Sequence, residues 1–286
     1  MIVSDFSREA FIRLMLHLKK DRFASEAANR NSSLRFDPSR PDIKTMSADP
    51  PAELPPRRDR AELAYLLPMG VFMAFTFAGG QWKVFYPLAY VLKTLAVAGL
   101  LLMLWRYYTT VRWTNLGLGF AVGLVGLVQW IGMEKLFMSV PWMSWTRMTS
   151  DIRAEAFRPY EHFESAAAAG AFIAARWAGA SLVVPVMEEL FWRDFLWRSI
   201  ASPNDFKLQQ VGEYDRAAFW GVPLLFAVVH PQWLTSIVWA LLVGWLLWRT
   251  RSIGACIVAH ATTNFLLGAY VLIAWYGFGR DEWFFW

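Results

Sequence analysis

Three charged side chains end an apolar stretch in the second half of the chain. Glu188 and Glu189 follow the largely apolar run 178–187, and Arg193 lies four positions beyond Glu189. A charged side chain inside a lipid bilayer costs several kcal/mol, so it is a candidate for function. Residues four positions apart share a helix face, so Glu189 and Arg193 can pair. Glu188 points about 100° away from Glu189, which leaves it free to face a cavity and act as a base.

Two later apolar stretches carry groups that can assist such a base. His230 is preceded by Phe226 one helical turn earlier, so the two rings can pack together. His260 and Asn264 are four positions apart and therefore share one helix face. An imidazole and an amide on that face can donate hydrogen bonds to an oxyanion that develops during acyl transfer. Counted along their helices, Glu188, His230 and His260 lie at similar depth, so we expect them to meet.

The composition indicates that these groups belong to a membrane protein. Hydrophobic residues make up 56% of the 286 residues, and charged residues make up 18%, below the roughly 25% of an average soluble domain. The net charge is +5, but the cations cluster at the ends of apolar segments instead of forming a basic face with interleaved aromatic residues. We therefore expect the lipid bilayer and a peptide or membrane-attached protein substrate as partners, and no nucleic acid.

Apolar runs of about 17–25 residues, the length that crosses a hydrocarbon core of about 30 Å, predict the elements. We expect an all-α, polytopic transmembrane bundle of seven spans around an intramembrane catalytic cavity, or eight spans if residues 134–165 dip back into the membrane. Trp and Tyr side chains near segment ends, Trp283 among them, are expected at the membrane interface. The expected spans are 62–80, 84–105, 115–133, 166–187 (continuing as a helix toward 200), 217–234, 235–248 and 253–276, with Pro231 at the bend between the fifth and sixth.

Three regions follow from these patterns: residues 1–60, 61–164 and 165–286. The first is polar and rich in proline, and we expect a flexible cytoplasmic extension with a short amphipathic helix over 6–19, or a true translation start at Met46. The second holds the first three spans and a loop, and the third holds the candidate site. Lys and Arg flank alternate ends of the spans, which predicts a cytoplasmic N-terminus. Arg176, inside the fourth span, is expected to pair with an acidic neighbour or to extend to the membrane surface.

At these residues the sequence resembles a known family. The segment EELFWR (Glu188–Arg193) resembles the EExxxR signature of the CAAX-protease and bacteriocin-processing family of intramembrane endopeptidases. FAVVH (Phe226–His230) resembles its FxxxH motif, and HATTN (His260–Asn264) resembles its HxxxN/D motif. The three motifs occur in the family's order within residues 165–276. The resemblance implies a helical bundle with a protease cavity inside the membrane.

The same resemblance implies a reaction and a role for each residue. Glu188 activates the attacking water with help from His230, and His260 and Asn264 stabilise the oxyanion. The bond that is hydrolysed lies near the C-terminus of a membrane-associated protein or peptide, prenylated or not. The additional N-terminal spans resemble a bacterial subgroup related to CAAX prenyl proteases, so the bacterial inner membrane is the expected location. The residues expected to organise the site are Glu189, Arg193 and Phe226.

Three alternatives stay open from the residues alone. Glu188, His230 and His260 form a three-ligand set of the kind that catalytic zinc uses, although the chain has no HExxH motif; we favour a mechanism without a metal or other cofactor. Cys256, four positions before His260, is the nucleophile if the protein is a thiol peptidase. In a non-catalytic scaffold or a transporter-like protein, the carboxylates would bind a proton or a ligand.

Overall fold

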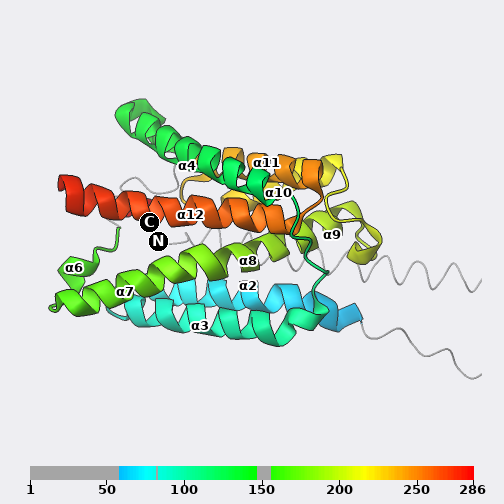
Figure 1. The fold of residues 1–286 in the computed structure, drawn as a ribbon, viewed down its shortest axis with the longest axis horizontal. Coiled ribbons are helices and arrows are strands. Elements are labelled where there is room, and N and C mark those ends of the chain that lie inside the picture. The colour runs from blue at the N-terminus through cyan, green and yellow to red at the C-terminus, as the bar shows by residue number, and fades with distance from the viewer. Residues whose placement is uncertain (1–57, 82, 147–155) are drawn as a thin grey trace, which may run out of the picture.

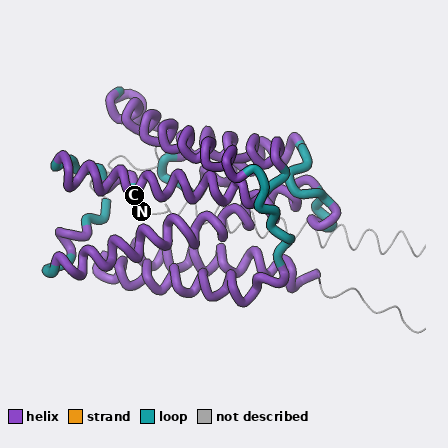
Figure 2. The backbone as a smooth tube through the Cα atoms, in the orientation of Figure 1, coloured by secondary structure: helices purple, strands orange, loops and turns teal. Residues whose placement is uncertain are grey.

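The computed structural model describes residues 58–81, 83–146 and 156–286, and these form a bundle of helices joined by loops (Figures 1 and 2). Six helices are long and apolar enough to cross a membrane. The predicted class, an all-α polytopic transmembrane bundle, is confirmed. The predicted amphipathic helix over 6–19 and the alternative start at Met46 lie outside the described residues. The six spans are Ala61–Gln81, Tyr86–Tyr107, Leu116–Ser139, Ala166–Ala201, Trp233–Thr250 and Ile253–Phe278.

The fourth span is one continuous helix whose winding changes four times. It contains α7 (Ala166–Ala178), a π-helical turn (Gly179–Val183), α8 (Val184–Glu189), a second π-helical segment (Leu190–Leu196) and α9 (Trp197–Ala201). The other helices are α2 (Arg58–Gln81), α3 (Tyr86–Leu104), α4 (Leu116–Ser139), α6 (Pro159–His162), α10 (Arg216–Val228), α11 (Trp233–Thr250) and α12 (Ile253–Phe278). Short 3-10 turns cover Lys83–Phe85, Trp105–Tyr107, Pro141–Thr146, Phe206–Leu208 and Trp283–Phe285.

The predicted fifth span over 217–234 is wrong. Residues Arg216–Val228 form a helix of 13 residues, which is about 20 Å long and too short to cross the hydrocarbon core. The helix ends before His230 because a residue that precedes proline disfavours helical geometry, and Pro231 follows. The predicted bend at Pro231 is present, since α11 begins at Trp233.

An eighth span over 134–165 is also not seen in the part of that region that the structure describes. Helix α4 ends at Ser139 and a 3-10 turn covers Pro141–Thr146. The next described element is the four-residue helix α6. Residues 147–155 lie outside the described part of the chain.

Helix α12 lies at the centre of the bundle (Figure 1). It packs against α4, α8 and α11, while α2 packs against α3 on the other side of α8. Close approach of α4 to α12 depends on glycines, because a Cβ at Gly119, Gly123 or Gly126 would lie within 2.9 Å of atoms such as the carbonyl oxygens of Ala255 and Ala259. Small residues of this kind bring membrane helices into contact. The tight α4–α12 interface fixes the helix that carries His260 and Asn264.

The segment that follows α12 folds back against the bundle. Trp283 is fully buried and packs with Ile173 and Val271. Ion pairs anchor the segment, since Arg158 lies 2.7 Å from Asp281 and Lys135 lies 3.2 Å from Glu282. The segment returns to the bundle and buries the indole of Trp283 there, so this side chain packs against protein; its expected place at the membrane interface stays a prediction. The ion-paired residues and a buried apolar cluster form a small second core. The ion pairs are Arg158–Asp281 and Lys135–Glu282, and the cluster consists of Ile173, Leu267, Val271, Trp283, Phe284 and Phe285.

Candidate active site

The two adjacent glutamates lie at the end of α8, between the two π-helical segments. Such segments are rare in proteins, and those that exist are often found at functional sites. The extra residue in the turn changes the direction of the side chains around it. Glu188 is 7% exposed and Glu189 is fully buried. Both carboxylates are thus held inside the bundle.

Glu189 connects two other helical segments through one oxygen atom. Its Oε1 accepts a hydrogen bond from Nη1 of Arg193 at 3.0 Å and one from Nδ1 of His260 at 2.8 Å. The pair with Arg193, four positions along the same helix, is the one expected from the spacing. The contact with His260 was not expected, because it depends on how α12 packs against α8. Glu189 therefore holds both the guanidinium and the imidazole in place.

Aromatic rings enclose the Arg193 guanidinium. It lies 5.1 Å from the ring centre of Phe226 and 5.2 Å from that of Trp239. The Trp239 ring also lies 4.6 Å from the ring of His260, so the indole contacts two of the site's charged or polar groups. Trp239 was missed from the sequence. Its position seven residues into a span, away from the interface where tryptophans usually gather, was the available signal.

His230 lies in the connection between α10 and α11. Its Nδ1 donates a hydrogen bond to the Phe226 carbonyl oxygen at 2.8 Å, and its ring stacks on the Phe226 ring at 4.1 Å between centres. A carbonyl oxygen only accepts, so the proton sits on Nδ1 and Nε2 of the neutral ring carries the lone pair. The expected packing of Phe226 beside His230 is present, and it leaves Nε2 able to accept a hydrogen bond.

Asn264 ties α12 to the first π-helical turn. Its Nδ2 donates to the carbonyl oxygen of Ala180 at 2.9 Å. An amide nitrogen has two hydrogens, so one donor remains for another partner. Helix α12 therefore contributes both His260 and Asn264 to the site, each oriented by a contact with the fourth span.

A single cavity of about 280 Å³ brings these groups together. Its lining includes Glu188, Phe226, His230, His260 and Asn264, which the sequence placed on three separate apolar stretches. Oε2 of Glu188 is buried and has no hydrogen-bond partner among the described residues. The cavity is therefore a place where a buried carboxylate, two imidazoles and an amide face one space. The side chains of Lys93, Trp239 and Arg176, none of which was expected to contribute, also line it.

The alternative zinc set of Glu188, His230 and His260 lines this cavity. Within the described ranges, no group of three His, Cys, Asp or Glu side chains is arranged to hold a metal ion. Nδ1 of both imidazoles is hydrogen-bonded, and this orienting bond is found in metal-ligating histidines and in catalytic ones. Glu188, His230 and His260 thus share one cavity without being arranged as a coordination sphere.

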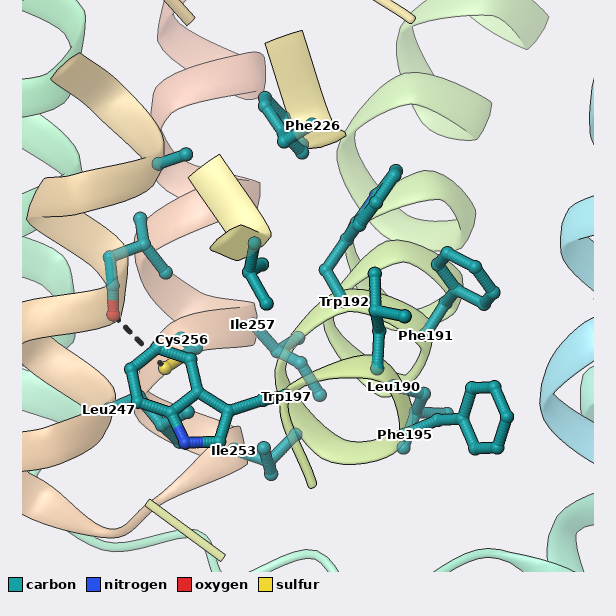
Figure 3. Close-up of a cluster of buried hydrophobic side chains, with 14 of the residues drawn as sticks. Leu190, Phe191, Trp192, Phe195, Trp197, Phe226, Leu247, Ile253, Cys256 and Ile257 are labelled. Atoms are coloured by element: carbon teal, nitrogen blue, oxygen red, sulfur yellow. Dashed lines mark hydrogen bonds between the residues drawn. The ribbon is translucent and has the colours of Figure 1, made fainter. Parts of the chain in front are cut away.

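Cys256 does not line the cavity. It is fully buried, and Figure 3 shows it within a cluster of apolar side chains that includes Leu247, Ile253 and Trp197. Its Sγ lies 3.9 Å from the carbonyl oxygen of Val243. Because Nδ1 of His260 is bonded to Glu189 and the thiol faces apolar neighbours, the geometry gives no support to the thiol peptidase.

Comparison with known families gives a match over the part of the chain that carries the three motifs. Residues 170–266, about a third of the chain, match the family model described as type II CAAX prenyl endopeptidase, Rce1-like. The matched range holds all three motifs, so the resemblance to the CAAX-protease and bacteriocin-processing family is confirmed. No curated protein and no solved structure matches the chain. Helices α2, α3 and α4 lie outside the matched range.

Proposed function

We propose, from the premise that residues 170–266 form an Rce1-like CAAX prenyl endopeptidase core, that this chain hydrolyses a peptide bond near the C-terminus of a membrane-associated protein or peptide. The observation that supports this most is the shared cavity, which is lined by a buried glutamate and by histidines from two other segments. A general base has to lie within hydrogen-bond reach of the proton that it removes, directly or through one water molecule, and a shared cavity gives a water molecule and a substrate that position.

In the proposed mechanism, Glu188 removes a proton from a water molecule that attacks the carbonyl carbon of the substrate. Nε2 of His230 accepts the second hydrogen bond of that water and so orients it. The carbonyl oxygen becomes an oxyanion as the carbon becomes tetrahedral. Glu188 then passes the proton to the amine as the C–N bond breaks, and the two products are a carboxylic acid and an amine.

Oxyanion stabilisation falls to His260 and Asn264. Nδ1 of His260 already donates to Glu189, so the ring reaches the oxyanion through Nε2 and carries both ring protons when it does so. A buried carboxylate behind an imidazole stabilises such an imidazolium. The second amide hydrogen of Asn264 provides the other donor. Glu189 and Arg193 act by holding His260 in position, and we favour a reaction that needs no metal.

The proposed orientation places the N-terminus and the basic ends of the helices in the cytoplasm, in a bacterial inner membrane. Cations gather where α3, α4, α11 and α12 begin or end, and contacts bring these ends together. The backbone nitrogen of Gly254 donates to the carbonyl of Arg112 at 3.2 Å, and Arg251 bonds to Gln210 at 3.4 Å. Clustered Arg and Lys at one end of a bundle predict the cytoplasmic face. A substrate tail then reaches the cavity from that side.

A comparison of membrane-protein C-termini in cells tests the proposal. Cells that produce the wild-type chain are compared with cells that produce Glu188→Gln, and with cells that produce Glu164→Gln as a control. Glu164 is an exposed carboxylate outside the cavity. We expect shortened C-termini that appear with the wild type and with Glu164→Gln but not with Glu188→Gln.

The non-catalytic alternative predicts another result. A scaffold or a transporter-like protein would leave the same set of C-termini in all three strains, although growth or transport could still change with Glu188→Gln. Identical C-termini, with equal amounts of each protein in the membrane, would therefore contradict the endopeptidase.

A further inference from the structure

Two buried cations line the same cavity as Glu188. Lys93 on α3 is 7% exposed and Arg176 on α7 is 6% exposed. Nζ of Lys93 donates to Oγ1 of Thr76 at 3.1 Å and lies 4.4 Å from the ring centre of Tyr90. Both side chains are therefore held inside the bundle instead of extending to its surface.

Arg176 has no acidic partner among the residues that the structure describes. Its guanidinium lies over aromatic rings, 5.9 Å from the centre of Tyr90 and 5.1 Å from that of Trp286. Nη1 is buried and makes no hydrogen bond to any described residue. Among the described residues the expected pairing of Arg176 with an acidic neighbour is therefore not seen, and the guanidinium lies inside the bundle.

The energetics of this arrangement favour an anion. Removing an ion from water costs several kcal/mol even after the protein relaxes. A desolvated cation over an aromatic ring regains about 2 kcal/mol or more, which offsets only part of that cost, and arginine cannot lose its proton in a protein. Lys93 and Arg176 also share the Tyr90 ring, so two like charges lie near each other. A negatively charged ligand between them offsets both penalties.

The distance from this pair to Glu188 follows from helix register. The Tyr90 hydroxyl donates to the carbonyl of Arg176 at 3.2 Å, and Thr94 lies beside Gly179. Lys93 is therefore level with the residues just after Arg176, nine to twelve positions before Glu188. At about 1.5 Å per helical residue these backbone positions are about 13–18 Å apart along the helix axis. The long side chain of Lys93 reaches back from there, close enough to Glu188 for their charges to interact. An extended chain advances about 3.3 Å per residue, so four or five residues span the distance between the backbone positions, and fewer suffice because the side chains reach inward.

We propose that Lys93 and Arg176 bind the free C-terminal carboxylate of the substrate and thereby set how far from that end the bond is cut. This inference rests on the proposed endopeptidase function and adds a recognition element to the same cavity. The planar guanidinium of Arg176 suits a carboxylate, because it can donate two parallel hydrogen bonds to the two oxygens. Lys93 adds a point charge from the opposite helix.

The test uses the purified full chain in liposomes and a pool of quenched-fluorescent octapeptides with apolar residues in the last four positions. The pool is made with a farnesylated cysteine and without it, and each form carries either a free C-terminal carboxylate or a carboxamide. The amide keeps the shape and removes the charge. We expect the wild type to cleave the acid with a kcat/KM about 10- to 100-fold higher than that for the amide, as for a hydrogen bond to a charged group.

The ratio of kcat/KM for the acid to kcat/KM for the amide is then measured in three variants. In Lys93→Met and Arg176→Gln the ratio should fall toward one, whereas Arg176→Lys should keep part of it because the charge remains. Arg249→Gln removes an exposed cation outside the cavity, and its ratio should equal that of the wild type. Cleaved bonds are mapped by mass spectrometry, and we expect the wild type to cut three to five residues from the free carboxylate.

The outcomes separate this inference from the function on which it rests. Equal cleavage of acid and amide by the wild type, or a ratio that survives in Lys93→Met and Arg176→Gln, would overturn the carboxylate site while leaving the endopeptidase intact. If a variant does not fold, the wild-type ratio and the positions of cleavage still show whether the free carboxylate of the substrate is recognised. Absence of cleavage of every peptide by the wild type would instead count against the endopeptidase itself.

Discussion

At the scale of single residues, the site depends on Glu189 as much as on Glu188. One carboxylate oxygen of Glu189 accepts from both Arg193 and His260. The i,i+4 spacing predicted the first of these contacts because both residues lie on one helix. It could not predict the second, which joins residues 71 positions apart. The division of labour between the two glutamates is therefore a tertiary property, although their chemistry is visible in the sequence.

Substitution of Arg193 by lysine tests this arrangement. The variant Arg193→Lys keeps the charge but loses the planar group between the rings of Phe226 and Trp239. Arginine and lysine are not interchangeable at a stacked site, and small displacements in an active site reduce rates strongly. We expect kcat/KM for peptide cleavage to fall by about 10- to 100-fold, together with a lower unfolding temperature.

A matched control lies on the same helix. Arg198 pairs with Asp194 at 2.6 Å, also four positions apart and buried. Its other partners include Thr109, Gln209 and Phe206, none of which lines the cavity, whereas Arg193 packs on the cavity-lining rings of Phe226 and Trp239. Arg198→Lys should lower the unfolding temperature while the folded protein keeps its kcat/KM within about threefold, since the cavity is unchanged. Equal losses of kcat/KM in both variants would show that Arg193 serves stability alone.

At the scale of elements, apolar run length predicted most boundaries within a few residues, because the bilayer itself sets the length of a span. One exception is the third span, which was predicted to end at residue 133 and ends at Ser139. The other is the pair 217–234 and 235–248, where the predicted boundary between two adjacent apolar runs was placed too far along the chain. The structure ends α10 at Val228 and starts α11 at Trp233, so His230 lies in a connection. The π-helical segments around Glu188 were not predicted either, because no local sequence signal distinguishes them from α-helix.

The α4–α12 interface yields a prediction with opposite signs at two positions of one helix. In Gly123→Ala the new Cβ would lie 2.6 Å from the carbonyl oxygen of Ala259, so α4 has to move, and overpacking of this kind costs about 1–3 kcal/mol. In Gly132→Ala the new Cβ has no atom within 4 Å, and alanine is favoured over glycine in a helix by about 1 kcal/mol.

Thermal unfolding in detergent and peptide cleavage check this pair. Gly123→Ala should unfold at a lower temperature and cleave more slowly, because it shifts the helix that carries His260 and Asn264. Gly132→Ala should unfold at an equal or higher temperature with unchanged cleavage. A lower unfolding temperature for both, or for neither, would contradict the proposed interface.

At the scale of the whole molecule, the cavity is lined by residues from inside and from outside the range that matches the family. The family match covers residues 170–266, and its motifs were visible in the sequence. Lys93 lies outside that range on α3, yet it lines the same cavity. No spacing rule connects residues 93 and 188, so only the packing of α3 against the fourth span could reveal that side chain. The predicted division at residues 60 and 164 stays a prediction.

Metal dependence is a property of the whole assembled cavity. We expect the purified protein to keep its peptide cleavage rate within about twofold after prolonged chelation, because the mechanism assigns base and oxyanion stabilisation to protein groups alone. Metal content is measured on the same samples before and after treatment. Loss of activity on chelation, with recovery on addition of zinc, would show instead that Glu188, His230 and His260 act as ligands.

The central claim is that Glu188 is the general base of an intramembrane endopeptidase. It is tested most directly by the cleavage rate of the purified chain in liposomes, with Glu188→Gln compared with the wild type and with Glu164→Gln at equal folded protein. We predict that Glu188→Gln lowers kcat by about 100- to 10,000-fold, the contribution of a positioned general base, while Glu164→Gln matches the wild type. A folded Glu188→Gln variant that cleaves at the wild-type rate would contradict the account.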